Sequence, residues 1–403
     1  RDWEEGPQSM STGEGGSEIT LDWGNTGLGG GALDATLCKG GSWQGMGESQ
    51  QCVLPRLDLE IREEGQQCVL PRFDLEIGEG KDLQINEKHL LGFGSTGCVY
   101  MGQLTLGADG VVPVAVKVLS DASLNHRQLF SEARGADSML AEFQREALIL
   151  ARSMHPNIVH CYGGSLRPCT SKPAFIVQEL CEASLHALMY DPFLSPTVLG
   201  QLAGSSCADS SSRMSLRTGV GRLLPLRRAL EVASDVASAL VYLHPRVLHR
   251  DIKSANVLLS ADGTAKLGDM GLSMVKPSGA AQHEVHESYE EGTIAYLAPE
   301  CMCFSPSEQI ILTEKVDVYS FGVLLNELVT GTRPFFGMTT PVLRVRVALG
   351  VARPELPAAA AASSLPEGLV PLIQACWAQE PENRPPATGV RAALQAMLAE
   401  LKE

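Results

Sequence analysis

Apolar and polar positions follow two different periods along the chain. Short strand-like runs begin near residue 83, and the clearest of them covers 112–119. Further along, 141–154 places Phe143, Ala147 and Leu150 on one face of a 3.6-residue period, which predicts a helix.

Helical patterns dominate after about residue 225. They cover 227–243, 316–330 and 387–401, and Gly331 closes the second of them. Strands first and helices later predict an α+β fold in two lobes.

Two stretches interrupt these patterns. Residues 120–138 are polar and mixed, while 191–222 is rich in Ser, Gly and Thr and contains Arg213, Arg217 and Arg222. Both are predicted to be surface loops, the second as an insert.

The first 49 residues form a low-complexity extension. Thirteen of the first 50 residues are glycine, mixed with Ser, Glu and Gln, a composition that buries too little apolar surface to order itself. We therefore expect a disordered N-terminal extension.

A tandem 16-residue repeat occupies residues 50–81. The copies 50–65 and 66–81 are identical at 12 of 16 positions, and each contains a strand-period alternation, at 57–61 and 73–77. A simple duplication, with the second copy leading as a strand into a domain at 83–400, is one interpretation. A docking function for the pair is the other.

Charge and hydropathy exclude some function classes. The formal net charge is −15, from 32 basic and 47 acidic side chains, which argues against binding nucleic acid or an anionic membrane through overall charge. No run approaches the roughly 18–20 apolar residues of a membrane span.

The eleven cysteines contain no CxxC pair. Because cysteines such as Cys161 and Cys376 lie in apolar segments, we expect reduced core thiols and a cytoplasmic protein. A disulfide framework or a zinc site is the alternative. The chain begins at Arg1 rather than Met, so an upstream membrane segment stays possible.

Candidate chemistry begins with a GxGxxGxV run at 91–99. Glycines let backbone N–H groups approach phosphate oxygens, although such turns are common and the signal alone is weak. After a strand-length gap, Ala115 and Lys117 lie two apart and share a face of a strand. A small apolar contact beside a cation suits a nucleotide base and its phosphates.

A denser polar motif covers 249–256, with the sequence HRDIKSAN. It lies just after a predicted helix and just before the apolar residues 257–259, where a purely structural role would not call for four polar groups. Asp269 then lies between Gly268 and Met270-Gly271, and Ala298-Pro299-Glu300 follows.

These motifs, in this order, make residues 83–400 resemble the protein kinase catalytic domain. The resemblance implies a small β-rich N-lobe and a larger helical C-lobe, with ATP in the cleft between them. It also implies Mg²⁺ as the metal and proteins as substrates.

The resemblance assigns site residues by position. Lys117 would bind the α- and β-phosphates of ATP, and Glu146 would be its partner from a helix. The implied ATP-binding residues are Leu91, Gly92, Phe93, Gly94, Ser95, Gly97, Val99, Ala115, Lys117, Glu179, Cys181 and Leu258.

The implied catalytic residues lie in the later motifs. Asp251 would accept or orient the proton of the substrate hydroxyl, and Lys253 would neutralise the γ-phosphate. Asn256 and Asp269 would hold Mg²⁺.

Other residues resemble the family's structural positions. Gln178 would guard the back of the ATP pocket, and 179–181 would be the hinge that hydrogen-bonds adenine. Asp317 would brace the catalytic loop. Glu300 and Arg384 would form a buried ion pair.

Smaller features indicate the subfamily. Lys253, together with Thr293 in GTIAYLAPE, is typical of serine/threonine kinases, while DVYSFGVLLNELVTGTRPF and CWAQEPENRPP resemble the tyrosine-kinase-like group, which includes Raf-type and receptor-like kinases. We therefore expect a serine/threonine protein kinase in signal transduction. A pseudokinase scaffold and a dual-specificity kinase are the alternatives.

Two departures from the family pattern stand out. Met270 replaces the usual Phe, and as a flexible apolar residue it can fill the same slot less rigidly. Lys117 and Glu146 are separated by 29 residues, which is longer than usual for the family.

The resemblance also implies a switch. An anionic group between Asp269 and Glu300 would pair with Arg250, with Ser288 as the best phosphorylation site and Tyr289 as the second, and with an upstream kinase or regulator as partner. Thr293 is expected to belong to the substrate platform. The same segment contains other candidates and several acids: Ser273, Ser278, Glu284, Glu287, Glu290 and Glu291.

Overall fold

The computed structural model divides into two compact units, Arg1–Arg72 and Phe73–Glu403. The residues that it describes are 21–22, 60–61, 83–93, 96–106, 110–119, 136–166, 173–203, 219–276, 283–285, 293–302, 310–358 and 363–401.

The first unit contains one described strand pair. Strand β1 (Leu21–Asp22) runs antiparallel to β2 (Glu60–Ile61). Strand β2 falls within the alternation predicted at 57–61. The matching alternation at 73–77 and most of the glycine-rich extension lie outside the described residues.

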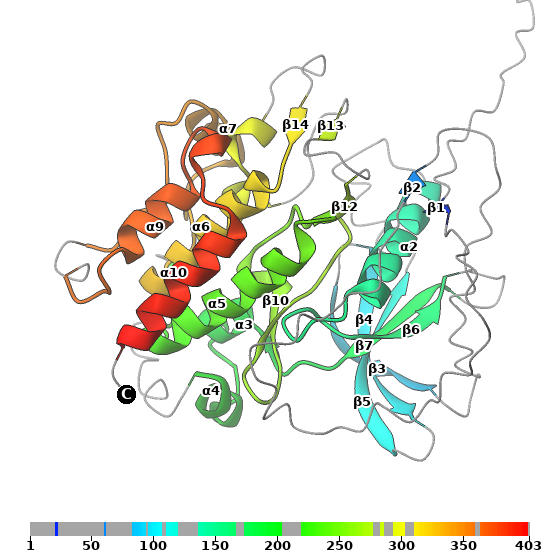
Figure 1. The fold of residues 1–403 in the computed structure, drawn as a ribbon. Coiled ribbons are helices and arrows are strands. Elements are labelled where there is room, and N and C mark those ends of the chain that lie inside the picture. Colours follow the sequence, from blue (N-terminus) through cyan, green and yellow to red (C-terminus); the bar gives the residue numbers. More distant parts are fainter. Residues whose placement is uncertain are drawn as a thin grey trace, which may run out of the picture. The chain divides into compact units, whose positions relative to one another are not determined.

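The second unit begins with an antiparallel sheet of five described strands in the order β3-β4-β5-β7-β6 (Figure 1). One face buries Val114, Val116 and Val177. Phe143 and Ala147 of helix α2 pack with Ile176 on the other face. The elements of this N-lobe are β3 (Leu83–Phe93), β4 (Gly97–Thr105), β5 (Val111–Leu119), α2 (Ala136–Arg152), β6 (Cys161–Ser165) and β7 (Phe175–Glu179).

Helices gather in a separate C-lobe around α6 (Figure 1). Nearly every residue of α6 is buried, which explains its apolar sequence, and Gly331 ends it in the left-handed conformation at φ +65°. The described helices are α3 (Leu185–Tyr190), α4 (Pro196–Ala203), α5 (Leu226–Leu243), α6 (Lys315–Thr330), α7 (Thr340–Ala348), α9 (Leu369–Cys376) and α10 (Ala387–Glu400).

Short strands and 3₁₀ helices connect these helices. The strands pair as β11-β10-β8, β12-β9 and β13-β14. They are β8 (Ala183–Ser184), β9 (Val247–Leu248), β10 (Val257–Leu259), β11 (Ala265–Leu267), β12 (Met274–Val275), β13 (His283–Val285) and β14 (Ile310–Leu312). Short 3₁₀ helices are η3 (Ser254–Asn256), η4 (Ile294–Tyr296), η5 (Pro299–Cys301) and η6 (Pro381–Asn383).

The predicted elements are largely confirmed. The strand at 112–119 is β5, and the three later helices are α5, α6 and α10 within one residue at each end. The helix expected at 141–154 begins five residues earlier, at Ala136, so the polar stretch 120–138 ends in helix.

The prediction of a surface loop at 191–222 is wrong at both ends. Residues 196–203 form α4, because Leu199 and Leu202 recur at helical spacing and are buried. At the other end Arg222 is also buried, and its guanidinium donates to the carbonyl of Leu188 at 2.8 Å. Residues 204–218 lie outside the described part.

Among the described residues, none of the helices combines the length and the apolar character that crossing a bilayer requires. Cys376 is fully buried, while Cys161 is half-buried.

An ion pair fastens the end of the C-lobe. The guanidinium of Arg384 donates to both carboxylate oxygens of Glu300, at 2.6 and 2.8 Å. Arg384 is fully buried and Glu300 is 19% exposed, so the pair is partly open to water on the acid's side.

A buried acid on α6 ties four segments together. Glu327 accepts hydrogen bonds from Tyr190 of α3 at 3.0 Å, from Ser254 of η3 at 3.0 Å and from Tyr296 of η4 at 2.6 Å. Burial raises the pKa of Glu327 to about 7, although the three hydroxyl donors oppose the shift.

This raised pKa predicts a pH dependence of stability. Because the folded-state pKa of about 7 lies above the ordinary glutamate pKa of 4.5, the folded state holds a proton that the unfolded state releases, and stability falls as pH rises through this window. At about 1.4 kcal/mol per pH unit, the Glu327 contribution to the fall is about 3 kcal/mol. Glu327→Gln should remove it, as measured by urea unfolding at pH 5 and pH 8. Glu231→Gln, at a more exposed acid on α5, is the control, and equal pH slopes in all three proteins would contradict the prediction.

Candidate active site

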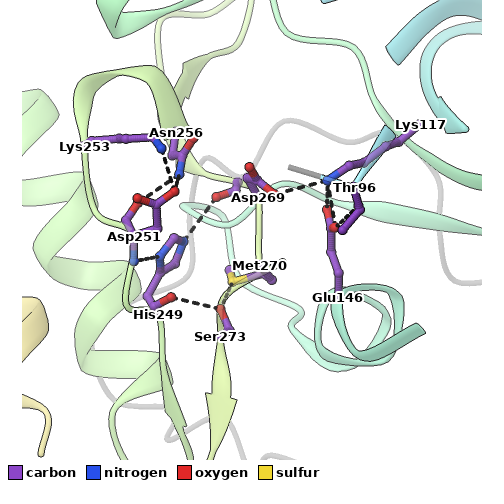
Figure 2. Close-up of polar contacts among 11 residues, drawn as sticks. Thr96, Lys117, Glu146, His249, Asp251, Lys253, Asn256, Asp269, Met270 and Ser273 are labelled. Atoms are coloured by element: carbon purple, nitrogen blue, oxygen red, sulfur yellow. Dashed lines mark hydrogen bonds and ion pairs between the residues drawn. The ribbon is translucent and has the colours of Figure 1, made fainter. Parts of the chain in front are cut away.

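The first part of the site is a buried lysine between two acids. Strand β5 directs Lys117 toward α2, where its Nζ lies 2.7 Å from both carboxylate oxygens of Glu146. The same Nζ lies 3.1 Å from Oδ1 of Asp269 (Figure 2). Burial alone would lower the pKa of Lys117, but the carboxylates of Asp269 and Glu146 raise it. Lys117 is therefore held as a cation.

Thr96 also belongs to this cluster, although no motif in the sequence assigns it a role. Its Oγ1 donates to Oε2 of Glu146 at 3.3 Å, and the residue is fully buried (Figure 2). The available signal was its position inside the glycine-rich run, only one residue before Gly97. A hydroxyl there can act on the Lys117–Glu146 pair directly.

The sheet register places several predicted pocket residues on the face that carries Lys117. Val99 of β4 lies opposite Lys117, and Gln178 of β7 lies opposite Ala115. Directly opposed residues share a face, as do residues two apart on one strand. These four side chains therefore line the same side of the sheet.

The glycine-rich run turns at an open edge of the sheet. A Cβ added to Gly92 would have no atom within 4 Å, so a ligand could approach its backbone. Leu91 is 43% and Phe93 is 78% exposed. Gly94 and Ser95 lie outside the described residues.

Gly97 must be a glycine for a structural reason. A Cβ on this residue would overlap the backbone oxygen of Val118 on β5. A side chain there would push apart the two strands that orient Lys117. The requirement for glycine is therefore independent of any phosphate contact.

The predicted hinge connects the two lobes. The carboxylate Oε1 of Glu179 accepts from the backbone N–H of His160 at 2.7 Å and lies 3.0 Å from Nζ of Lys266. The backbone N–H of Glu179 donates to the carbonyl of His160 at 3.0 Å, so the side chain and the N–H of this residue are both engaged. Burial raises the pKa of Cys181 to about 12, so its thiol is not a nucleophile at neutral pH. Leu258, half-buried on β10, follows in the C-lobe.

A buried acid on α6 holds the loop at 249–256. Asp317 accepts from the backbone N–H groups of His249 at 2.8 Å and Arg250 at 2.7 Å, and from the ring of His244 at 3.1 Å. Burial alone would raise the pKa of Asp317, but the hydrogen bond and charge of His244 bring it below the ordinary value. Arg250 adopts a φ of +68°, a strained conformation that these bonds hold in place.

Asp251 lies at the centre of the second polar cluster. Its Oδ2 accepts from Nζ of Lys253 at 2.6 Å and from Nδ2 of Asn256 at 2.8 Å (Figure 2). Lys253 also donates to Oγ1 of Thr293 at 2.9 Å. With Oδ2 engaged, Oδ1 is the oxygen of Asp251 that can accept a proton from an incoming hydroxyl.

His249 connects the segment that carries Asp269 with the segment that carries Asp251. His249 contacts the carbonyl of Gly268 through Nε2 at 3.1 Å, while its Nδ1 accepts from the backbone of Asp251 at 3.3 Å. Because a carbonyl only accepts, Nε2 carries the proton. Asp269 itself has a φ of +54°.

Met270 is fully buried in the core of the C-lobe, so it fills an apolar slot. Its sulfur lies 3.4 Å from Oγ of Ser273. Ser273 is also fully buried and donates to the carbonyl of His249 at 3.3 Å (Figure 2). Burial therefore removes Ser273 from the candidate phosphorylation sites.

The oxygen atoms near the cleft suit Mg²⁺. The amide nitrogen of Asn256 is engaged by Asp251, so Oδ1 is its available ligand atom, and Asp269 adds a carboxylate. In the part of the chain that the structure describes, no group of three or more His, Cys, Asp or Glu residues could hold a metal. A pair of oxygen ligands fits Mg²⁺, which is usually completed by waters and substrate phosphates.

Comparison with known proteins gives a match over most of the second unit. The family model of the protein tyrosine and serine/threonine kinase matches residues 85–394. Every motif used above lies within that range.

Individual relatives agree. The chain is 28% identical to the dual specificity protein kinase shkA of Dictyostelium discoideum, over 79% of this chain and 50% of the relative. It is 31% identical to the Arabidopsis thaliana serine/threonine-protein kinase CTR1, over 75% of this chain and 30% of the relative. For the Arabidopsis serine/threonine/tyrosine-protein kinase HT1, identity is 31% over 63% of this chain and 54% of the relative.

The chain thus spans about half or less of the length of these relatives. The lobes, the two polar clusters and the family match agree with one another and with the motifs in the sequence. The chain belongs to the protein tyrosine and serine/threonine kinase family, in its tyrosine-kinase-like group.

Proposed function

We propose that this protein transfers the γ-phosphate of ATP to serine and threonine hydroxyls of other proteins in signal transduction. The observation that supports this most directly is that two polar clusters lie on either side of Asp269 (Figure 2). Lys117, held by Glu146, faces Asp269 on one side, and Asp251 with Lys253 and Asn256 lies on the other (Figure 2).

The geometry suits a direct transfer. Oδ1 of Asp251 would accept the proton of the acceptor hydroxyl as that oxygen bonds to the γ-phosphorus. The bond from the γ-phosphorus to the β-phosphate oxygen breaks, and ADP leaves with the electron pair. Lys253 lies beside Asp251, so its charge can offset that of the transferred group.

The nucleotide would lie along the shared face of the sheet. Lys117 would hold the α- and β-phosphates, with Ala115 and Val99 against the base. Asn256 and Asp269 would hold Mg²⁺, which neutralises phosphate charge when bound. The roles of Leu91, Phe93 and the glycines near them, and of Glu179, Cys181 and Leu258, are part of the same proposal.

Dual specificity is the second candidate, because two of the relatives are named as kinases for both types of hydroxyl. A pseudokinase is less well supported, since Lys117, Asp251 and Asp269 are all present, with Lys117 3.1 Å from Asp269 and Asp251 bound to Lys253. Phosphoamino-acid analysis of products would distinguish serine and threonine transfer from tyrosine transfer.

We also propose that residues 83–400 are the catalytic domain, with an insert that lies within 191–222 and excludes α4 and Arg222. The extension at 1–49 and the repeat at 50–81 would lie outside the catalytic machinery. A cytoplasmic location is proposed from the reduced thiols alone.

Asp251→Asn tests the central role. The change should lower kcat by about a hundredfold or more, because the amide cannot take the proton, while Kd for ATP should change by less than about twofold. Both are measurable by peptide phosphorylation and by calorimetry with MgATP.

The matched control is Asp262→Asn, which makes the same chemical change in the exposed turn between β10 and β11. It should keep kcat near the wild-type value. A kcat for Asp251→Asn above a few per cent of wild type would refute the role given to Asp251.

A switch is proposed around Arg250. An anionic group on the segment after Asp269 would meet the guanidinium of Arg250, whose backbone Asp317 already fixes. Thr293 suits the substrate platform, since Lys253 binds its hydroxyl. Ser288 is the favoured site and Tyr289 the second, and both lie outside the described residues.

Ser288→Ala should leave basal activity in place and abolish the further rise on phosphorylation, because nearby glutamates offer less charge than a phosphate. Mass spectrometry of the phosphorylated protein, paired with rate measurements before and after phosphorylation, checks this. An unchanged rise in the variant would place the switch elsewhere.

A further inference from the structure

A pocket of about 390 Å³ lies beside the proposed catalytic residues, with Lys253 in its lining. Its walls come from four segments: α3, the catalytic loop, η4 and the turn after α6. The lining residues that matter here are His186, Lys253, Thr293, Tyr296, Glu327 and Arg333. The volume is large enough for a side chain of a bound protein.

The pocket lies close to where an acceptor hydroxyl would bind. Lys253 lines it, and the same Nζ lies 2.6 Å from Oδ2 of Asp251. An extended peptide advances about 3.3–3.6 Å per residue, so a side chain in this pocket would belong to a residue within about three positions of the acceptor.

Arg333 supplies a cation to the wall. Its Cζ lies 4.6 Å from the centroid of the Tyr190 ring, and its backbone N–H donates to the carbonyl of Gly219 at 2.9 Å. The stacking on Tyr190 orients the guanidinium and the backbone bond fixes the main chain, and neither contact neutralises the charge. Among the described residues no carboxylate oxygen lies within 4.0 Å of this guanidinium, so its planar donor edge stays available to an anion.

The acid in the pocket does not compete for a basic ligand. Glu327 is 1% exposed, and its two oxygens accept from Tyr190, Ser254 and Tyr296. A cation from a substrate would have to reach a buried carboxylate that already accepts three hydrogen bonds and approach Arg333 at the same time. Both effects disfavour it.

His186 adds no second charge. Its ring centroid lies 5.0 Å from that of Tyr190, and burial together with the charge of Arg333 lowers its pKa. The imidazole is therefore neutral at pH 7. Lys253 is already paired with Asp251 and Glu327 is buried, so Arg333 is the charged group of the pocket that a bound side chain can reach.

We propose that this pocket binds an acidic side chain of the protein substrate and that Arg333 determines this specificity. The ligand class is a carboxylate or a phosphate attached to a residue near the acceptor, bound by the donor edge of the guanidinium. The inference rests on the proposed kinase function, because the acid is recognised in a substrate of that reaction.

The test uses the full chain and a set of synthetic peptides with one serine acceptor in a neutral background. Glu, Gln, Arg or phosphoserine is placed in turn at each of the three positions on either side of the acceptor. At one of these positions wild type should show a kcat/KM about tenfold higher for Glu than for Gln, from one charge-assisted contact. The phosphoserine arm distinguishes a phosphate preference from a carboxylate preference.

Arg333→Gln should abolish the preference for the acid, and Arg333→Glu should favour Arg at the same position. Arg346→Gln, which removes the same charge from an exposed site on α7, should keep the wild-type preference. An equal preference for Glu in Arg333→Gln, the lack of any preference in wild type, or a wild-type preference for Arg would each overturn the proposal.

A second readout separates this proposal from the kinase function. The same peptides with alanine in place of the acceptor are measured for binding by fluorescence anisotropy. Tighter binding of the acidic peptide that depends on Arg333 supports the pocket even if no peptide is phosphorylated, an outcome that would refute only the proposed function. Equal binding of the acidic and neutral peptides to wild type would overturn the pocket.

Discussion

A single buried ammonium group, that of Lys117, connects the two lobes. Lys117 is 3% exposed, and a cation in such a place must be compensated by nearby acids. Glu146 provides one carboxylate from α2 and Asp269 provides another from the C-lobe. Because each acid belongs to a different lobe, the charge balance of one lysine also fixes where the two lobes meet.

Helix α6 holds the catalytic loop in place, also through buried acids. Its two buried acids, Asp317 near the start and Glu327 near the end, hold backbone N–H groups and hydroxyl groups of three other segments. Breaking a buried charged contact of this kind typically costs several kcal/mol, so these acids fix the loop with little freedom. The loop can then hold Asp251 and the strained Arg250 in place before any substrate binds.

The sequence predicted the protein family, because motifs such as GxGxxGxV and HRDIKSAN combine local spacing with a demand for particular residue types. Helix periodicity also located α5, α6 and α10. It could not show which distant residues meet. Thr96, Glu327 and Arg333 take part through contacts with residues 30 or more positions away, or through a pocket built from several distant segments. The short helix α4 was missed because Ser, Gly and Thr in the rest of the stretch concealed two leucines at helical spacing.

The carboxylate of Glu146 is proposed to position Lys117 for the nucleotide. The decisive measurement is the kcat/KM for ATP of Glu146→Gln, compared with Glu142→Gln, which makes the same change one turn earlier on α2. We expect a loss of about tenfold or more for Glu146→Gln, with an unchanged KM for the acceptor peptide, and near wild-type values for Glu142→Gln. Wild-type kinetics for Glu146→Gln, or equal losses in both variants, would contradict it.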